Sequence, residues 1–182
     1  IINLKSESTL INLTVMKKII PLLLLVILSV QQSFSKGNQK MVDSMLTLLK
    51  TTPLDTSRLR ILGTLCSNLQ GVGNYKSQIE YAMEMRALAE KLMPKATGKE
   101  QAYIKKMFAN SYLSVARAHR NLSNYDESIK NALAAKKIYE EMDSLAFVAT
   151  TLETISNATT DKGDLEGGIK ISKEAIAIYE RL

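Results

Sequence analysis

The side chains best suited to chemistry are few in this 182-residue chain. His119 is the only histidine and Cys66 the only cysteine, which excludes a multi-histidine metal site and an internal disulfide. Leu62, Leu65 and Leu69 surround Cys66 in the sequence, so we predict a small buried side chain rather than a reactive thiol. A catalytic cysteine or histidine is therefore not expected.

Two acidic clusters and a pair of glycines are the other candidates for a site. The acidic clusters, within residues 140–143 and 161–166, fall at the expected ends and caps of helices, where such charges have a structural role. Gly167-Gly168 lacks both the preceding strand and the following lysine of a phosphate-binding loop. We therefore expect no enzymatic activity, no cofactor and no metal ion.

The composition is typical of a globular, helix-rich domain. Hydrophobic residues make up 46% of the chain and charged residues 23%, with three prolines and no tryptophan. The net charge is +6, but the cations are spread along the chain without a basic run. This distribution argues against nucleic acid as a partner.

The N-terminal region has the layout of a secretory signal peptide. Met16-Lys17-Lys18 precedes about a dozen apolar residues and then a short polar stretch that ends at Ser35. We predict a signal peptide over 16–35, cleaved before Lys36, and an exported protein of the periplasm or cell envelope. The apolar run is shorter than the roughly 20 residues that span a bilayer, which argues against a stable transmembrane helix. We expect membrane contact only through this signal peptide or through a further segment downstream. A buried core helix is the alternative reading.

Residues 1–15 contain no methionine and precede this signal. We interpret them as translation from upstream of the true start at Met16, and expect them to contribute nothing to the fold.

Helical periodicity runs through the rest of the chain, and nothing in it indicates a strand. The pattern predicts helices at 38–50, 57–70, 75–93, 100–122, 124–142, 145–162 and 165–182. Asp55 or Thr56 should cap the second of these helices, and Asn124 the fifth through its side chain. The expected inward-facing residues include Ile79, Ala82, Met83, Ala87, Leu88, Ile104, Phe108, Ile129, Leu133 and Tyr139.

Three of the turns between these helices share one pattern. Asn74, Asn124 and Asp164 stand before a helix, and an isoleucine follows five residues later in each case. In the preceding helices, a bulky residue twelve positions before the cap is followed four later by a small one: Cys66, Ala116 or Ser156. The chain therefore contains an internal repeat with spacings of 50 and 40 residues.

These residues resemble the tetratricopeptide repeat. The best copy, 109–142, matches the family pattern at Tyr112, Val115, Ala116, Leu122, Asn124, Tyr125, Ala132 and Ala135. Gln78, Ser128 and Gly168 depart from the pattern, because alanine is usual at their position. The resemblance implies an all-α, right-handed α-solenoid of antiparallel helix pairs. We expect a capping helix and linker at 36–56 and a repeat domain at 57–182, with repeats at about 57–98, 100–143 and 145–182.

The long repeats also resemble the N-terminal region of Bacteroidetes-type periplasmic sensor proteins. Two functions are therefore possible for this chain. It is either a free scaffold or the sensory input domain of a longer membrane signalling protein, a histidine kinase or transcriptional regulator. The last helix has no polar capping helix after it, and solenoids need their terminal apolar face covered. Either a continuing chain or self-association at this end would cover it.

In tetratricopeptide repeats, the first helix of each pair lines a concave groove that binds proteins or peptides. By this resemblance, the groove-lining positions include an asparagine and two arginines in the middle repeat, which suit an acidic or carboxylate-bearing segment. The candidate peptide-binding residues are Arg60, Ser67, Asn110, Leu113, Arg117, Arg120, Glu153 and Asn157.

Overall fold

The computed structural model describes residues 16, 17, 19–21, 23 and 39–182. The chain divides into two units, 1–38 and 39–182, and each is considered by itself. The described residues of the first unit are helical and exposed. The expectations for residues 1–15 and for cleavage after Ser35 lie outside the described residues. Within the described part, no helix combines the length and the apolar character that crossing a bilayer requires.

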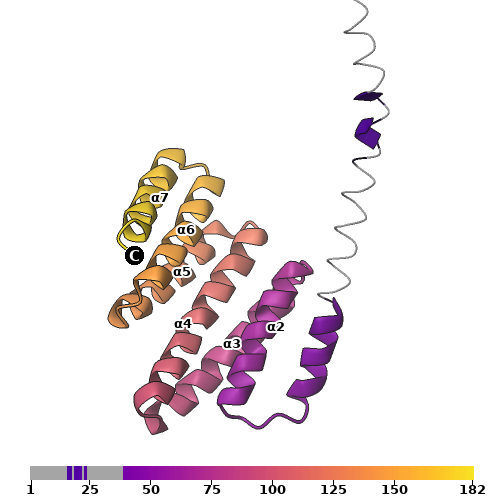
Figure 1. Ribbon diagram of the computed structural model, residues 1–182, viewed down its shortest axis with the longest axis vertical. Helices are drawn as coiled ribbons and strands as arrows, with labels where there is room; N and C mark the ends of the chain where they lie inside the picture. Colours follow the sequence, from indigo (N-terminus) through magenta and orange to yellow (C-terminus); the bar gives the residue numbers. More distant parts are fainter. Residues whose placement is uncertain (1–15, 18, 22, 24–38) are drawn as a thin grey trace, which may run out of the picture. The chain divides into compact units, whose positions relative to one another are not determined.

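The second unit is all-α, and the part of the chain that the structure describes contains no strand. A helix at 39–49, here called the N-terminal helix, precedes six longer helices. They are α2 (Thr56–Gly71), α3 (Tyr75–Leu92), α4 (Gly98–Asn121), α5 (Tyr125–Glu141), α6 (Leu145–Asp161) and α7 (Leu165–Tyr179), with a short 3₁₀ turn, η1 (Met93–Lys95), before α4. Consecutive helices pack antiparallel, as Figure 1 shows, and each of α2 to α6 contacts the next. The predicted architecture of sequential helix pairs, consistent with a helical repeat, is confirmed.

Side-chain caps begin some of these helices, though not all that were predicted. Asp55 accepts hydrogen bonds from the backbone N–H groups of Ser57 and Arg58, and Asn74 accepts one from Ser77. Asn124 precedes α5 but makes no side-chain cap, so that prediction was wrong. Its amide nitrogen lies instead 3.5 Å from the His119 ring.

One backbone turn closes four helix junctions. At each junction a residue adopts a left-handed conformation: Gly73, Ser123, Asp143 and Gly163, with φ values of 75°, 60°, 50° and 109°. The next N–H then bonds to a carbonyl five residues back, at N···O distances of 2.8 to 3.1 Å. This is the Schellman closure of a helix C-terminus. The internal repeat in the sequence indicated three of these four turns but not the one at Asp143.

The helix faces are rotated from the expected ones in several places. Met83 and Leu133 are 57% and 51% exposed, and Ala87 is exposed as well, so their predicted inward orientation was wrong. The buried face begins instead four residues after each cap, at a position held by Gln78, Ser128, Val148 and Gly168. The spacing of apolar residues did not predict this buried face, because the position is polar or lacks a side chain in three of the four helices.

Gly168 shows why this position is restricted. A Cβ atom there would lie 2.0 Å from the Thr160 hydroxyl oxygen and 3.2 Å from the Ser156 carbonyl oxygen. The hydroxyl of Ser156 donates to the Gly168 carbonyl at 2.7 Å, and Cys66 Sγ makes the corresponding contact with the Gln78 carbonyl at 3.8 Å. The two helices of a pair therefore cross closely at this point.

Ser128 is fully buried, and its hydroxyl has no hydrogen-bond partner in the described part of the chain. Replacing it with alanine removes an unsatisfied polar group and introduces the better helix former. We expect Ser128→Ala to raise the free energy of unfolding by about 0.5–1 kcal/mol in urea denaturation. Ser111→Ala is the control, because that buried hydroxyl donates to the Phe108 carbonyl at 2.6 Å and its loss should destabilise the fold. A lower stability for Ser128→Ala would contradict this account.

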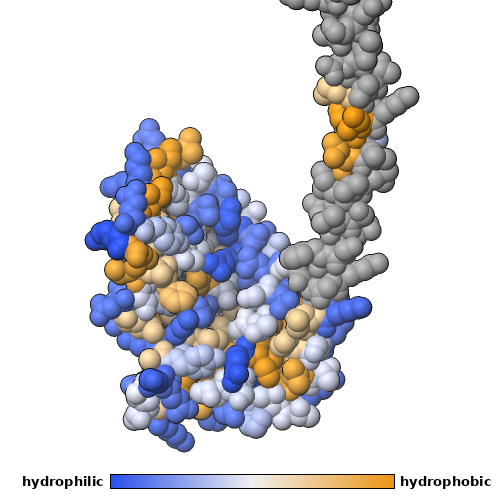
Figure 2. Space-filling model, in the orientation of Figure 1, coloured by the Kyte–Doolittle hydropathy of each residue, from blue (hydrophilic) through white to orange (hydrophobic). Residues whose placement is uncertain are grey.

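The last helix leaves an apolar face uncovered. The exposed residues are Leu165, Ile169, Ile176, Tyr179 and Leu182. Figure 2 shows hydrophobic side chains gathered over α7. Self-association through this face stays a prediction.

Candidate functional site

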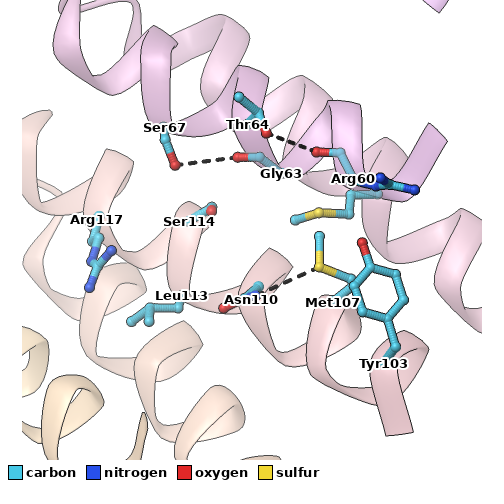
Figure 3. A pocket seen from close by; sticks show the side chains of 11 residues that line it. Arg60, Gly63, Thr64, Ser67, Tyr103, Met107, Asn110, Leu113, Ser114 and Arg117 are labelled. Atoms are coloured by element: carbon cyan, nitrogen blue, oxygen red, sulfur yellow. Dashed lines mark hydrogen bonds between the residues drawn. The ribbon is translucent and has the colours of Figure 1, made fainter. Parts of the chain in front are cut away.

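Two neighbouring cavities lie along the first helices of the three pairs. The first, of about 380 Å³, lies between α2 and α4, with a contribution from α3. Its lining consists of Arg60, Gly63, Thr64, Ser67, Met85, Tyr103, Met107, Asn110, Leu113, Ser114 and Arg117. Figure 3 shows Arg60 and Arg117 toward its two ends, with Asn110 and Met107 between them.

The second cavity, of about 150 Å³, adjoins the first, since Arg117 lines both. It lies where the C-terminal part of α4 meets α6 and the end of α2. Its lining consists of Gln70, Arg117, Arg120, Asn121, Thr150, Glu153, Thr154 and Asn157. We call the two cavities together the groove.

All eight candidate residues line this groove. Arg60, Ser67, Asn110 and Leu113 belong to the first cavity, and Arg120, Glu153 and Asn157 to the second, with Arg117 shared. Leu113 differs from the others because it is only 4% exposed and also packs in the core cluster of α4 to α7.

Sequence reasoning missed several residues that line the first cavity, among them Met85, Tyr103 and Met107. Tyr103 lies on the extra N-terminal turns of α4, which has 24 residues where α2 has 16 and α6 has 17, whereas Met107 stands at the repeat position of Ser57 and Phe147. Their spacing from Asn110, three and seven residues, places them on the same helix face and could have indicated them. Repeat position could not indicate Tyr103, because the other repeats lack these turns.

The two arginines of α4 differ in their surroundings. Arg120 pairs with Asp161 on α6, with 2.7 Å between Nε and Oδ2. Arg117 has no carboxylate within 4 Å among the described residues, although Glu153 is near enough to act on it electrostatically. Burial lowers the pKa of Arg117, and Tyr139 and Glu153 oppose that shift. Arg117 is thus a half-buried, charged donor that faces both cavities without an ion-pair partner.

Asn110 is held from behind the groove. Its Oδ1 accepts a hydrogen bond of 2.6 Å from the hydroxyl of Tyr139 on α5. The remaining Asn110 contact is a long one, 3.8 Å from Nδ2 to the Met107 sulfur, drawn in Figure 3. The amide hydrogens of Asn110 are therefore its available groups.

Gly63 lets α2 approach α4 at the first cavity. A Cβ atom on Gly63 would lie 2.7 Å from the terminal methyl of Met107. The neighbouring hydroxyls are occupied within their own helix, since Ser67 donates to the Gly63 carbonyl and Thr64 to the Arg60 carbonyl. Both hydroxyl oxygens still have lone pairs that can accept from a ligand.

A third cavity, of about 630 Å³, includes in its lining the ion pair of Lys105 and Glu141, 3.0 Å apart. Apolar side chains make up much of its wall: Met93, Ala102, Phe108, Ile138 and Met142. None of the eight candidate residues lines it.

Burial raises the pKa of the Cys66 thiol to about 12, so the reactive thiolate is disfavoured. Among the described residues, no three histidine, cysteine, aspartate or glutamate side chains are grouped so as to hold a metal ion.

A scan against protein-family models and a search among curated proteins find no match. The structure thus shows an all-helical protein of sequential antiparallel helices, consistent with a helical repeat, with a polar groove along the first helices of its pairs.

Proposed function

We propose that the protein is a non-catalytic, tetratricopeptide-type scaffold of the cell envelope that binds an acidic protein or peptide segment in its groove. The observation that carries this proposal is the meeting of all eight candidate residues around two cavities joined at Arg117.

The repeat itself supports the tetratricopeptide assignment. The cap residues Asn124 and Asp164 are 40 residues apart, and each pair is closed by the same turn. Position four of each second helix is buried, as the close crossing of a tetratricopeptide pair requires. The signal-like segment at 16–35 supports export to the cell envelope.

The charges of the groove favour an acidic ligand. Arg60 and Arg117 make no ion pair among the described residues, whereas Arg120 is matched by Asp161. The face of α4 from Tyr103 to Asn121 is roughly 27 Å long at the usual helical rise. An extended peptide of about eight residues covers that length.

A peptide pair of matched shape tests the proposal. The probe is a fluorescein-labelled ten-residue peptide of alternating glutamate and alanine, and the control replaces each glutamate with glutamine. We expect the purified full chain to bind the glutamate peptide at least tenfold more tightly in fluorescence anisotropy at low salt, with an affinity that falls as salt is added. Equal affinity for both peptides, or binding of neither, would overturn the proposal.

A further inference from the structure

Two tyrosines contact the groove from behind at equivalent places in successive pairs. Tyr139 lies in the last turn of α5 and bonds to Asn110 Oδ1 at 2.6 Å. Tyr179 ends α7, 40 residues later, and its hydroxyl lies 3.1 Å from Thr150 Oγ1, which is also 40 residues beyond Asn110. Asn110 lines the first cavity of the groove and Thr150 the second.

The tyrosine is the donor in both bonds. A hydroxyl has a single hydrogen, and that of Thr150 is directed to the Ala146 carbonyl at 3.0 Å, so Tyr179 must donate to Thr150. Tyr139 is fully buried, and in the described part of the chain Asn110 Oδ1 is the acceptor within reach of its hydroxyl. A buried hydroxyl needs an acceptor, which fixes the Asn110 oxygen toward Tyr139.

The environment of Tyr139 keeps this donor in place. Its ring stacks on Phe147 of α6, with 5.0 Å between centroids and 16° between planes. Burial raises the pKa of Tyr139, and Arg117 only partly opposes this shift, so the hydroxyl stays protonated. The bond therefore comes from a rigid side chain that belongs to the core.

The first pair lacks this arrangement. Ala89, also fully buried, stands 50 residues before Tyr139, and Arg60 stands 50 before Asn110. Arg60 is exposed, and its guanidinium makes no hydrogen bond or ion pair among the described residues. The groove thus combines two side chains that accept a tyrosine hydrogen bond, Asn110 and Thr150, with one, Arg60, whose guanidinium has no partner among the described residues.

We propose that Tyr139 is a positioning residue that holds the Asn110 amide with its NH₂ group toward the groove, where it binds a carbonyl or carboxylate oxygen of the ligand. The inference rests on the proposed function and adds to it the ligand group that Asn110 recognises. Without the tyrosine hydroxyl the amide can rotate and present oxygen instead, which would repel an acceptor. The ligand class is therefore an extended chain that offers an oxygen acceptor at Asn110 and a negative charge at Arg117.

Tyr139→Phe tests the inference, and Tyr179→Phe is the matched control, since it removes the same hydroxyl from the equivalent bond. The first measurement needs no ligand: ¹⁵N relaxation of the Asn110 side-chain amide, assigned with Asn110→Ala. We expect a rigid amide in the wild type and in Tyr179→Phe, and a mobile one in Tyr139→Phe. An equally rigid amide in Tyr139→Phe would overturn the inference.

The second measurement is a double-mutant cycle with the glutamate peptide. We expect Tyr139→Phe to weaken binding three- to tenfold in the wild-type background and to have no further effect in Asn110→Ala. Equal weakening in both backgrounds would show a merely structural role and overturn the inference. If the wild type binds neither peptide, the proposed function fails, and the relaxation measurement still decides whether Tyr139 positions Asn110.

Discussion

Arg58→Ala should lower the free energy of unfolding by about 2–3 kcal/mol, since hydrogen bonds to a charged group are worth about 1.5–3 kcal/mol each and are not additive. Arg58 joins three segments of the chain. Its Nη1 donates to the backbone carbonyl of Leu49, the last residue of the N-terminal helix, at 2.6 Å, and to that of Thr52, just beyond this helix, at 3.2 Å. Its Nε and Nη2 reach Glu84 on α3, at 2.9 and 2.8 Å.

Much of this loss should be local. Val42 and Leu49 attach the N-terminal helix to the core cluster of α2 and α3, and Arg58 is the polar link that binds its C-terminal end. A cation at a helix C-terminus also interacts favourably with the helix dipole. In hydrogen exchange, amides of residues 39–49 should exchange much faster in Arg58→Ala, while those of α5 to α7 should change little.

Arg60→Ala is the control for this substitution. Arg60 lies two residues further along α2, is exposed, and has no side-chain partner among the described residues. Its replacement should change stability by less than about 0.5 kcal/mol in the same urea titration. Similar losses for both variants would refute the role given to Arg58.

Arg117→Ala should weaken binding of the glutamate peptide at least tenfold, or about 1.4 kcal/mol. Arg117 is half-buried, faces both cavities and lacks an ion-pair partner in the described part of the chain, so a ligand carboxylate would gain a charge-assisted hydrogen bond. Removing it should also reduce the salt dependence of binding. Anisotropy titrations at two salt concentrations measure both effects.

Arg120→Ala provides the comparison, because it removes the same charge one helical turn away. Arg120 is already paired with Asp161, and exposed ion pairs are worth about 0–1 kcal/mol. We expect a loss of affinity below about threefold, and the double variant to resemble Arg117→Ala. Equal effects of the two single substitutions would indicate that only net charge matters and that Arg117 has no special position.

The helices could be predicted from the sequence because residues close to each helix end determine where it begins and ends. A polar cap such as Asp55 begins a helix, and a left-handed turn residue such as Gly73 or Gly163 ends one. Helix faces were less predictable. Met83 and Leu133 are apolar and correctly spaced but exposed, because the neighbouring helices cover the faces that carry Gln78 and Ser128.

The sequence could predict which residues line the groove, but not which of them form ion pairs or how the Asn110 amide is oriented. Repeat position alone placed Arg117 and Asn110 on one surface. Which arginine is neutralised depends on Asp161, 41 residues from Arg120, and which way the amide faces depends on Tyr139, 29 residues from Asn110. Such pairings arise only when helices are packed, so no local pattern reveals them.

The turn at Asp143 shapes how this chain can be altered. It joins one helix pair to the next with the same backbone geometry that Ser123 and Gly163 adopt inside the pairs. The three junctions after α4 therefore have equivalent backbone conformations. The helices themselves are not interchangeable, because groove-lining and outer helices alternate. We therefore expect duplication or loss of chain to be tolerated in steps of two helices, whereas a step of one would bring the wrong face to the groove.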